Sequence, residues 1–479
     1  MNRRRPDRLI LVLLFVLIWG SIVACGSWEW NPNNTTRLFA AISLVEDGDA
    51  RIDEFADLTI DKAQFDGHAY MDKAPGTTLM ALPAVAVAQA VTGEHSKPLS
   101  HVFGAEDLGQ FLKTRLRLAV ALTIAPLTAL AAVLLYDLGL ALSGSAAGAL
   151  FGALGFGLGS PVWGWSTTLF GHAPVAALVV VAIWAIWRAT RVGADPEWRW
   201  YALAGAALGW ALVVEHPALL VGAPVGLWGI WRALRQPTRS RTRMLIAALV
   251  AGTVAVLPLL GYNLIAYGTP FRLGYQGVVG FDGMQQGLFG LTYPKPEVLA
   301  AILVGSDRGM LWVAPVMLLA PFGIARLIRN PATRDIGWLA VAGAVAAFLY
   351  NASYFYWNGG NATGPRHALP ALAFLSLGLA PFWADLRGTG GRWFVGALLA
   401  LSIAINAVIA SAEIFAPDPA TQPGRSIVDL VWRDRFMTGQ LRTIASEYWS
   451  MEPWQGFQLW FVAALFFVTL MMLRTRRLT

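Results

Sequence analysis

The chain of 479 residues is poor in charge and holds a single cysteine. Charged residues account for 14% of it, against about 25% in soluble globular proteins. One cysteine excludes a small scaffold held together by disulfide bonds. Hydrophobic residues account for 56% of the chain, which excludes a disordered protein. The shortage of charge and the excess of apolar residues together also exclude a soluble enzyme.

Apolar runs recur along the whole sequence, many of them roughly 18 residues or longer, and a helix of that length crosses the ~30 Å hydrocarbon layer of a membrane. The sequence therefore predicts an all-α polytopic membrane protein with about 12 transmembrane helices. The expected spans cover residues 9–27, 116–138, 146–163, 173–189, 200–215, 217–232, 244–262, 309–327, 335–352, 367–386, 393–411 and 457–473.

Basic residues beside the spans predict the orientation, and the chain has a net charge of +7. The first run follows residues 2–8 (NRRRPDR), which places the N-terminus in the cytoplasm. The short run 77–92 contains Pro83, so a helix at the outer interface fits it better than a span. With that choice, five basic clusters fall in the cytoplasm: Arg188/Arg191/Arg199, Arg232–Arg243, Arg326/Arg329/Arg334, Arg387/Arg392 and Arg474/Arg476/Arg477.

We therefore expect a multi-pass protein of the bacterial inner (plasma) membrane with both termini in the cytoplasm. Residues 22–25 (IVAC) also fit a lipoprotein signal, whose cleavage would leave the remaining topology unchanged. Long loops then lie on the outer, periplasmic side at residues 28–115, 263–308 and 412–456. Loops of this length are usually functional.

The first long loop contains two apolar stretches and a polar one between them. Leu38, Ala41, Ile42 and Val45 recur at helical spacing, which predicts an interfacial helix near 34–46. A second interfacial helix is expected near 77–92. Most acids between them suit a solvated loop. Acids and a lysine beside an apolar interface can also serve a lipid phosphate and a general base, and the candidates are Asp53, Asp61, Asp72 and Lys73.

Three shorter outer segments add candidates. His172 stands at the mouth of a span, within reach of acids from the first loop. Glu215 and His216 lie in a tight turn between two spans, which favours a structural role. Residues 354–367 (YFYWNGGNATGPRH) combine aromatic rings, which suit a sugar face, with Arg366, which suits a phosphate.

These segments resemble a known family. Residues 67–76 (GHAYMDKAPG) lie between the two predicted interfacial helices, and residues 356–360 (YWNGG), 364–366 (GPR) and 306–309 (SDRG) follow. This order resembles the GT-C type of glycosyltransferases that use lipid-linked sugars. The closer resemblance is to the bacterial branch related to protein O-mannosyltransferases and the lipid A aminoarabinose transferase. It covers residues 1–385, which we expect to form the catalytic module, whereas residues 386–479 add C-terminal helices and the outer loop 412–456.

The resemblance implies a GT-C-like fold and an enzyme that passes a sugar from a polyprenyl phosphate to an acceptor at the outer face, by inverting displacement. It implies that Lys73 and Arg37 bind the donor phosphate, and Arg366 could join them. The substrate is expected to contact Asp72, Tyr70, His68, Asn34, Trp357, Asn358 and His367.

The sequence departs from the family at two positions. Asn34 stands where relatives have a catalytic Asp, and Gly171-His172 stands where relatives place an acid. Either Asp53 or Asp61 acts as the base, with Asp53 preferred and His172 assisting, or the activity has been lost. A lipid-linked-sugar flippase or transporter and a non-catalytic membrane subunit are therefore alternative functions.

The expected partners are the polyprenyl-phosphate sugar donor, membrane lipids and an acceptor that the sequence does not identify, which can be a glycan, a lipid or a protein. No nucleic acid is expected. The sequence has no nucleotide-binding loop and no His/Cys metal cluster, so no cofactor and no metal site are predicted. A divalent cation held by the first-loop acids is left open.

Overall fold

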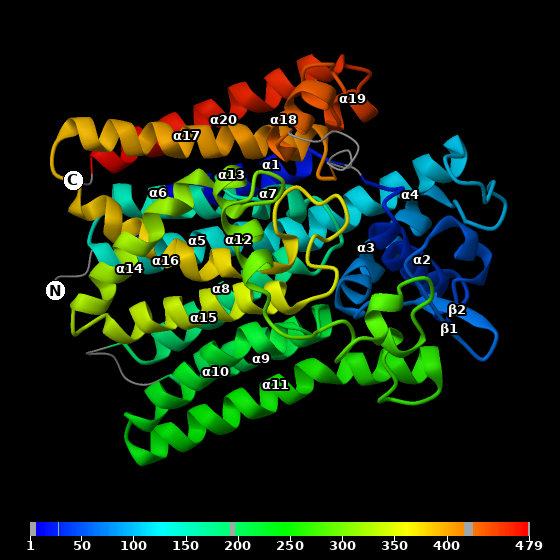
Figure 1. Cartoon of the computed structure of the whole chain (residues 1–479), viewed down its shortest axis with the longest axis horizontal. Helices are drawn as coiled ribbons and strands as arrows, with labels where there is room; N and C mark the ends of the chain where they lie inside the picture. Colours follow the sequence, from blue (N-terminus) through cyan, green and yellow to red (C-terminus); the bar gives the residue numbers. More distant parts are fainter. Residues whose placement is uncertain (1–5, 27, 192–196, 416–424, 478–479) are drawn as a thin grey trace.

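The computed structural model describes residues 6–26, 28–191, 197–415 and 425–477. Long helices lie side by side along one direction and form a bundle (Figure 1). The start of α1 (Arg8–Ala24) and the end of α20 (Pro453–Arg476) lie at the same end of this bundle. The segment between α1 and α4 (Glu106–Ala119) forms a cap at the opposite end.

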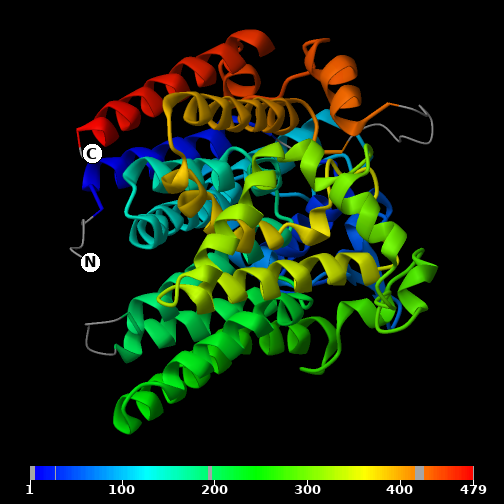
Figure 2. The same cartoon turned by 60° about the vertical axis from the view of Figure 1, so that its left-hand side comes forward.

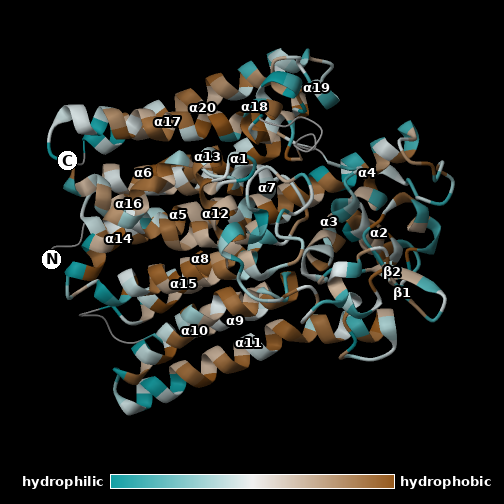
Figure 3. Ribbon diagram, in the orientation of Figure 1, coloured by the Kyte–Doolittle hydropathy of each residue, from teal (hydrophilic) through white to brown (hydrophobic). Residues whose placement is uncertain are grey.

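Each expected span coincides with helical structure. Within the described residues, six helical stretches are long and apolar enough to cross a membrane: Glu106–Ser143, His172–Ala189, Thr238–Tyr267, Arg334–Ser353, Thr389–Ala412 and Pro453–Arg476. The expected all-α polytopic class is confirmed, whereas the number of membrane crossings stays a prediction. Apolar residues cover the middle of the bundle, and hydrophilic ones gather at its two ends (Figure 3). Four of the six stretches are the helices α8 (His172–Ala189), α11 (Thr238–Tyr267), α15 (Arg334–Ser353) and α17 (Thr389–Ala412). The bundle also contains the shorter helices α6 (Ala146–Gly157), α9 (Trp198–Val214), α10 (Ala218–Leu234) and α16 (Ala371–Asp385).

The expected span 309–327 is not one continuous helix. It consists of α13 (Met310–Val313), the 3₁₀ turn η5 (Pro315–Leu319) and α14 (Ala320–Arg329). A proline disfavours the helical conformation in the residue before it, and Ala314, which precedes Pro315, has φ −145° and ψ 61°. The Ser402 hydroxyl then accepts a hydrogen bond from Val316 N at 2.9 Å.

The expected span 116–138 belongs to a longer helical stretch. Helix α4 continues through the π-helical turn η2 (Val120–Ile124) into α5 (Ala125–Ser143). Pro126 lies at the start of α5 and has no N–H to donate to the preceding turn, and such local adjustments accommodate proline inside long helices. The first helix after the cap therefore begins ten residues earlier than the apolar pattern alone indicates (position 106 rather than 116).

The cap contains both helices that the sequence predicts in the first loop. They are α2 (Pro32–Glu46) and α3 (Gly76–Thr92), and they pack against each other. Helix α2 is buried on all sides from Asn33 to Ser43, so neighbouring protein segments surround it. The expected position of the two helices at the membrane interface stays a prediction. The cap also holds a 3₁₀ turn, η1 (Asp53–Leu58), before α3.

A short antiparallel hairpin, which the sequence analysis missed, precedes α3. Strand β1 (Lys62–Phe65) pairs with β2 (His68–Met71), with Lys62 opposite Met71. The connecting residues are Asp66 (φ 52°) and Gly67 (φ 84°), the pair that favours a two-residue turn with positive φ. The hairpin fixes where the chain leaves β2, and therefore where residues 72–75 lie.

The C-terminal helices lie along one side of the bundle (Figure 2). Helix α20 contacts α1 through Trp460, whose indole Nε1 donates to Ser21 Oγ at 3.0 Å. Two short helices, α18 (Ile427–Val431) and α19 (Ile444–Tyr448), stand at the cap end. The remaining short elements are α7 (Val162–Ser166), η3 (Gly274–Gly277), η4 (Asp282–Gln285), α12 (Pro296–Val304), η6 (Arg366–Ala368) and the π-helical turn η8 (Trp432–Phe436).

Candidate active site

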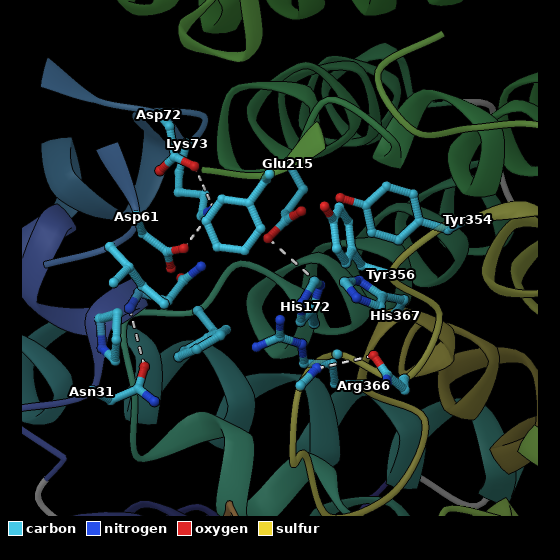
Figure 4. Close-up of a pocket in the computed structure, with 18 of the residues that line it drawn as sticks. Asn31, Asp61, Asp72, Lys73, His172, Glu215, Tyr354, Tyr356, Arg366 and His367 are labelled. Atoms are coloured by element: carbon cyan, nitrogen blue, oxygen red, sulfur yellow. Dashed lines mark hydrogen bonds and ion pairs between the residues drawn. The ribbon is translucent and has the colours of Figure 1, made fainter. Parts of the chain in front are cut away.

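A charged cavity of about 610 Å³ lies where the cap meets the helix bundle. Segments far apart in sequence line it, namely the cap, the turn before α8, the turn between α9 and α10, and the loops that follow α11 and α15. Figure 4 shows the first-loop acids and Lys73 on one side of the space and Tyr354, Tyr356 and His367 on the other. The ionisable lining residues other than tyrosine are Arg37, Asp61, Asp72, Lys73, His172, Glu215, Arg366 and His367.

Lys73 is held between two carboxylates. Its Nζ lies 2.6 Å from Asp72 Oδ2 and 3.4 Å from Asp61 Oδ1. Burial raises the pKa of Asp72 to about 6, with Lys73 lowering it in part and Asp61 raising it. Burial alone would lower the pKa of Lys73, but the two carboxylates outweigh it and hold that pKa above its usual value. The ammonium group is therefore fixed in place at the cavity wall and stays charged.

Arg37 connects the cap to the bundle. Its Nε donates to Asn33 Oδ1 at 3.0 Å, and its Nη1 donates to Ala74 O at 3.0 Å and to Thr77 Oγ1 at 2.9 Å. Its Nη2 lies 3.6 Å from Glu215 Oε1. Because most of its N–H groups are engaged by the cap, Arg37 contributes mainly positive charge to the cavity.

Arg366 differs from the other two cations. No carboxylate of the described residues lies within ion-pair distance of it, and its buried Nε has no hydrogen-bond partner there. Its guanidinium stands 4.9 Å from the ring centroid of Phe170 and 5.8 Å from that of Phe415. An arginine held by aromatic faces keeps its N–H donors available for an anion.

Glu215 reaches the cavity from the turn between α9 and α10. Its Oε1 lies 3.5 Å from His172 Nδ1, and the His172 ring meets that of His367 edge-on at 4.9 Å between centroids. The sequence interpretation of this turn as merely structural is therefore incomplete. A carboxylate at the end of an otherwise apolar helix was the available signal, but nothing in the sequence indicated which loop it would face.

The predicted residues divide into two groups. Asp53, the first choice for the base, lies outside the cavity: His68 Nδ1 is 2.7 Å from its Oδ2, and Ala69 N donates to its Oδ1 at 2.6 Å. Neither Asp53 nor His68 lines the cavity, and the pair is solvent-exposed. The predicted site residues that the structure brings together there are Arg37, Asp61, Asp72, Lys73, His172, Asn358, Arg366 and His367.

The other three predicted residues have structural contacts. Asn34 accepts a hydrogen bond from Leu169 N at 2.9 Å and donates to Trp28 O at 3.1 Å, so its amide joins two segments. The Tyr70 ring packs edge-on against Tyr267 at 5.5 Å. Trp357 packs against the small apolar cluster that contains Ile302. Sequence analysis missed several aromatic residues of the lining, including Tyr275, Phe281, Tyr350 and Phe415.

No metal cluster is evident in the described ranges, where no group of three His, Cys, Asp or Glu side chains has a suitable arrangement.

Solved structures with similar architecture include the oligosaccharyltransferase AglB from Archaeoglobus fulgidus, in complex with an inhibitory peptide and a dolichol-phosphate. It is 11% identical, with a TM-score of 0.50 over 83% of this chain and 54% of that one. The chain has a GT-C-like fold. ArnT from Cupriavidus metallidurans bound to undecaprenyl phosphate is also similar, at 15% identity and a TM-score of 0.49. The match covers 84% of this chain and 64% of ArnT.

The chain thus spans less than two thirds of either of these larger proteins. No protein-family model matches the sequence, and no curated protein is a significant match. The GT-C-like fold accounts for the architecture that the sequence resemblance implied: a helical bundle with a large first loop folded over one end. At these identities the likeness concerns the fold alone.

Proposed function

We propose that the protein is a membrane glycosyltransferase that takes a sugar from a polyprenyl-phosphate carrier and passes it to an acceptor hydroxyl in the cavity. The observation that carries the proposal is Arg366, a cation without a carboxylate partner in the described part of the chain, which faces a cavity that Lys73 and Arg37 also line. The likeness to ArnT and AglB, whose structures contain undecaprenyl phosphate and dolichol-phosphate, is consistent with this donor class.

The charges suit a departing phosphate. During transfer the acceptor oxygen forms a bond to the anomeric carbon, the bond from that carbon to the phosphate oxygen breaks, and the electron pair leaves with the phosphate. The carrier phosphate thereby gains negative charge, which Arg366 and Lys73 stabilise. A carboxylate of the cavity accepts the acceptor's proton. Fixed positive groups that meet the charge as it develops favour the transition state over the ground state.

The opposite wall suits a sugar. Tyr275, Tyr354 and Tyr356 line the cavity together with the amide side chain of Asn358. Aromatic planes pack against the C–H face of a sugar ring, and an amide can bond to its hydroxyls. We propose that the sugar occupies this side, with the carrier phosphate between Arg366 and Lys73, at the outer (periplasmic) face of the membrane.

Native mass spectrometry with undecaprenyl phosphate and phosphatidylglycerol offered together tests the donor class. We expect selective retention of undecaprenyl phosphate, and we expect Arg366→Met to weaken that retention by about tenfold or more, as for loss of a charge-assisted hydrogen bond. Arg235→Met is the matched control, because Arg235 also stands over an aromatic ring, Trp231, but lies away from the cavity.

Equal retention of the two lipids by the wild-type protein would contradict the proposal. Selective binding without any sugar transfer would instead favour a carrier-lipid flippase or a non-catalytic subunit.

A further inference from the structure

We infer that Glu215 is the general base that takes the proton from the acceptor hydroxyl, an assignment that rests on the proposed function. Glu215 was not among the sequence candidates for this role. Its side chain is largely buried, with 12% of its surface exposed, and it lines the cavity near the middle of the view in Figure 4.

The contacts of the other acids leave Glu215 as the available carboxylate. Asp53 lies outside the cavity and is bonded by His68 and Ala69. Asp72 Oδ2 accepts a hydrogen bond from Lys73 Nζ at 2.6 Å. Asp61 lies farther from the same ammonium group, at 3.4 Å, but its negative charge helps to hold Lys73 in place, and a proton taken up by Asp61 would remove that charge. A proton acceptor needs an oxygen lone pair that is not already engaged by a strong donor.

Glu215 meets this condition. Its nearest basic neighbours are His172 Nδ1 at 3.5 Å and Arg37 Nη2 at 3.6 Å, and both face the same oxygen, Oε1. Neither distance is that of a strong charge-assisted hydrogen bond, which is about 2.7–2.9 Å. Burial disfavours the ionised carboxylate, and the positive charge of Arg37 opposes this effect. Among the described residues no side chain donates a hydrogen bond to Oε2, so this oxygen is open to an acceptor hydroxyl.

A glycine makes room for this carboxylate. A Cβ atom at Gly171 would lie 2.5 Å from Glu215 Oε1 and 2.8 Å from its Cδ. Gly171 has φ −75° and ψ −18°, a conformation open to any residue, so backbone geometry does not require glycine there. The carboxylate of Glu215, which comes from another turn, occupies the space that a side chain at Gly171 would fill.

A second close contact fixes the turn that carries Glu215. A Cβ atom at Gly76 would lie 2.5 Å from Val214 Cα, so the start of α3 rests directly on the end of α9. The segment that presents Lys73 and the turn that presents Glu215 are therefore held against each other by backbone contact. Such contact keeps the proposed phosphate ligand and the proposed base at a fixed separation.

The competing explanation is that Glu215 only neutralises the buried Arg37. The two explanations differ in what glutamine at this position does. If Glu215 is only a counter-ion, Glu215→Gln leaves Arg37 with excess charge, which alters folding stability and carrier binding. If Glu215 is the base, Glu215→Gln keeps the shape, leaves carrier binding nearly unchanged and slows the transfer step.

The test measures single-turnover release of sugar, with water as the acceptor, from farnesyl phosphate carrying mannose, glucose, galactose or arabinose. Binding of farnesyl phosphate is measured in parallel. We expect Glu215→Gln to lower the release rate by about 100-fold or more, the usual size of a general-base contribution, with binding nearly unchanged.

Glu413→Gln is the matched control. Glu413 follows α17 as Glu215 follows α9: both are extended residues whose N–H closes the last helical turn, but Glu413 does not line the cavity. A relocation variant combines Glu215→Ala with Gly171→Asp, which returns a carboxylate to the same space from the other turn. We expect it to recover part of the lost rate, whereas Gly171→Asp alone lowers the melting temperature because Glu215 occupies that space.

The outcomes separate the two proposals. Release by the wild-type protein that Glu215→Gln leaves intact would overturn the assignment of the base and leave the proposed function standing. The same assignment fails if Glu215→Gln abolishes carrier binding along with release. Absence of release by the wild-type protein from every donor would count against the proposed function itself.

Discussion

Gly359 lies directly against the side chain of Arg366. A Cβ atom at Gly359 would stand 2.5 Å from Arg366 Nε and 2.9 Å from its Cδ. The neighbouring Gly360 also has a positive φ, 67° against 62° for Gly359, but a Cβ atom there meets nothing within 4 Å. The two glycines therefore share one backbone requirement and differ in their contact with the arginine.

Alanine at these two positions tests whether anion binding depends on the position of the Arg366 guanidinium group. Gly359→Ala should displace the guanidinium and weaken binding of undecaprenyl phosphate by about tenfold, in line with a lost charge-assisted hydrogen bond. Gly360→Ala should impose the same backbone strain with little effect on binding. Equal losses in the two variants, measured by native mass spectrometry, would show that strain and not Arg366 is responsible.

Lys73 allows stability and binding to be separated. Lys73→Ala leaves Asp61 and Asp72 close together without a counter-charge, so we expect a lower melting temperature as well as weaker carrier binding. Adding Asp72→Asn removes the excess negative charge and should restore the melting temperature, but not the binding. Recovery of both properties in the double variant would argue against Lys73 as a phosphate ligand.

The raised pKa of Asp72 predicts that binding of the lipid-phosphate donor depends on pH. Burial raises its pKa to about 6, partly opposed by Lys73. Below this pH Asp72 is protonated, and Lys73 has only Asp61 as a charged partner. A phosphodiester such as farnesyl-phosphate mannose keeps its charge from about pH 5 to about pH 7, so its affinity should fall several-fold over that range as Asp72 ionises. Asp72→Asn should flatten the profile.

The same group affects folding. Because the pKa of Asp72 is higher in the folded protein than the ordinary value of 3.8 for an aspartate, folding favours the protonated form. Its contribution to stability is therefore fully present below about pH 4 and is lost as the pH rises through about 6. Asp72→Asn should make the melting temperature less dependent on pH within this window, and an unchanged dependence would contradict the assigned pKa.

The sequence was informative where neighbouring residues carry the signal. The apolar runs indicate the helices, and residues 67–76 indicate Lys73, because a lysine directly before an apolar helix is visible in one stretch of sequence. The Asp66-Gly67 pair is also a sequence signal for the hairpin turn. Pro315 likewise marks the break in the expected span 309–327.

Contacts between segments far apart in the chain cannot be predicted from the sequence. Glu215 faces His172 and Arg37 only because two turns of the bundle meet the cap. Asp53 was preferred as the base on its position beside the apolar interface, but the hairpin brings His68 back onto it. Both cases depend on the path of the backbone in three dimensions, which a single sequence without aligned relatives does not reveal.

The orientation of the bundle in the membrane is a further prediction. The cap, which borders the cavity, lies at one end of the bundle, and the start of α1 and the end of α20 lie at the other (Figure 1). With the termini in the cytoplasm, His95→Cys in the cap should react with a membrane-impermeant maleimide from outside intact cells. Gly390→Cys, which is exposed at the other end, should react only after permeabilisation. The native Cys25 is buried and should stay unlabelled. The reverse labelling pattern would place the cavity in the cytoplasm.

Helix α9, which ends just before Glu215, packs closely against α11. On α9, a Cβ atom at Gly205 would collide with the carbonyl oxygen of Ala248 on α11, so the two backbones touch with no room for a side chain. Small residues permit such contact between membrane helices, where packing and not the hydrophobic effect drives association. Gly226 on α10 has nothing within 4 Å of its would-be Cβ and serves as the control.

Leucine at Gly205 should force α9 away from α11 and destabilise the protein by about 1–3 kcal/mol, the usual effect of overpacking. The melting temperature in detergent should fall for Gly205→Leu and stay near that of the wild type for Gly226→Leu. Because α9 ends at Val214, its displacement should also move Glu215 and slow sugar release without touching any cavity residue. A destabilised Gly205→Leu protein that keeps full activity at low temperature would show that the α9–α10 turn is held by the cap alone, through the contact between Gly76 and Val214.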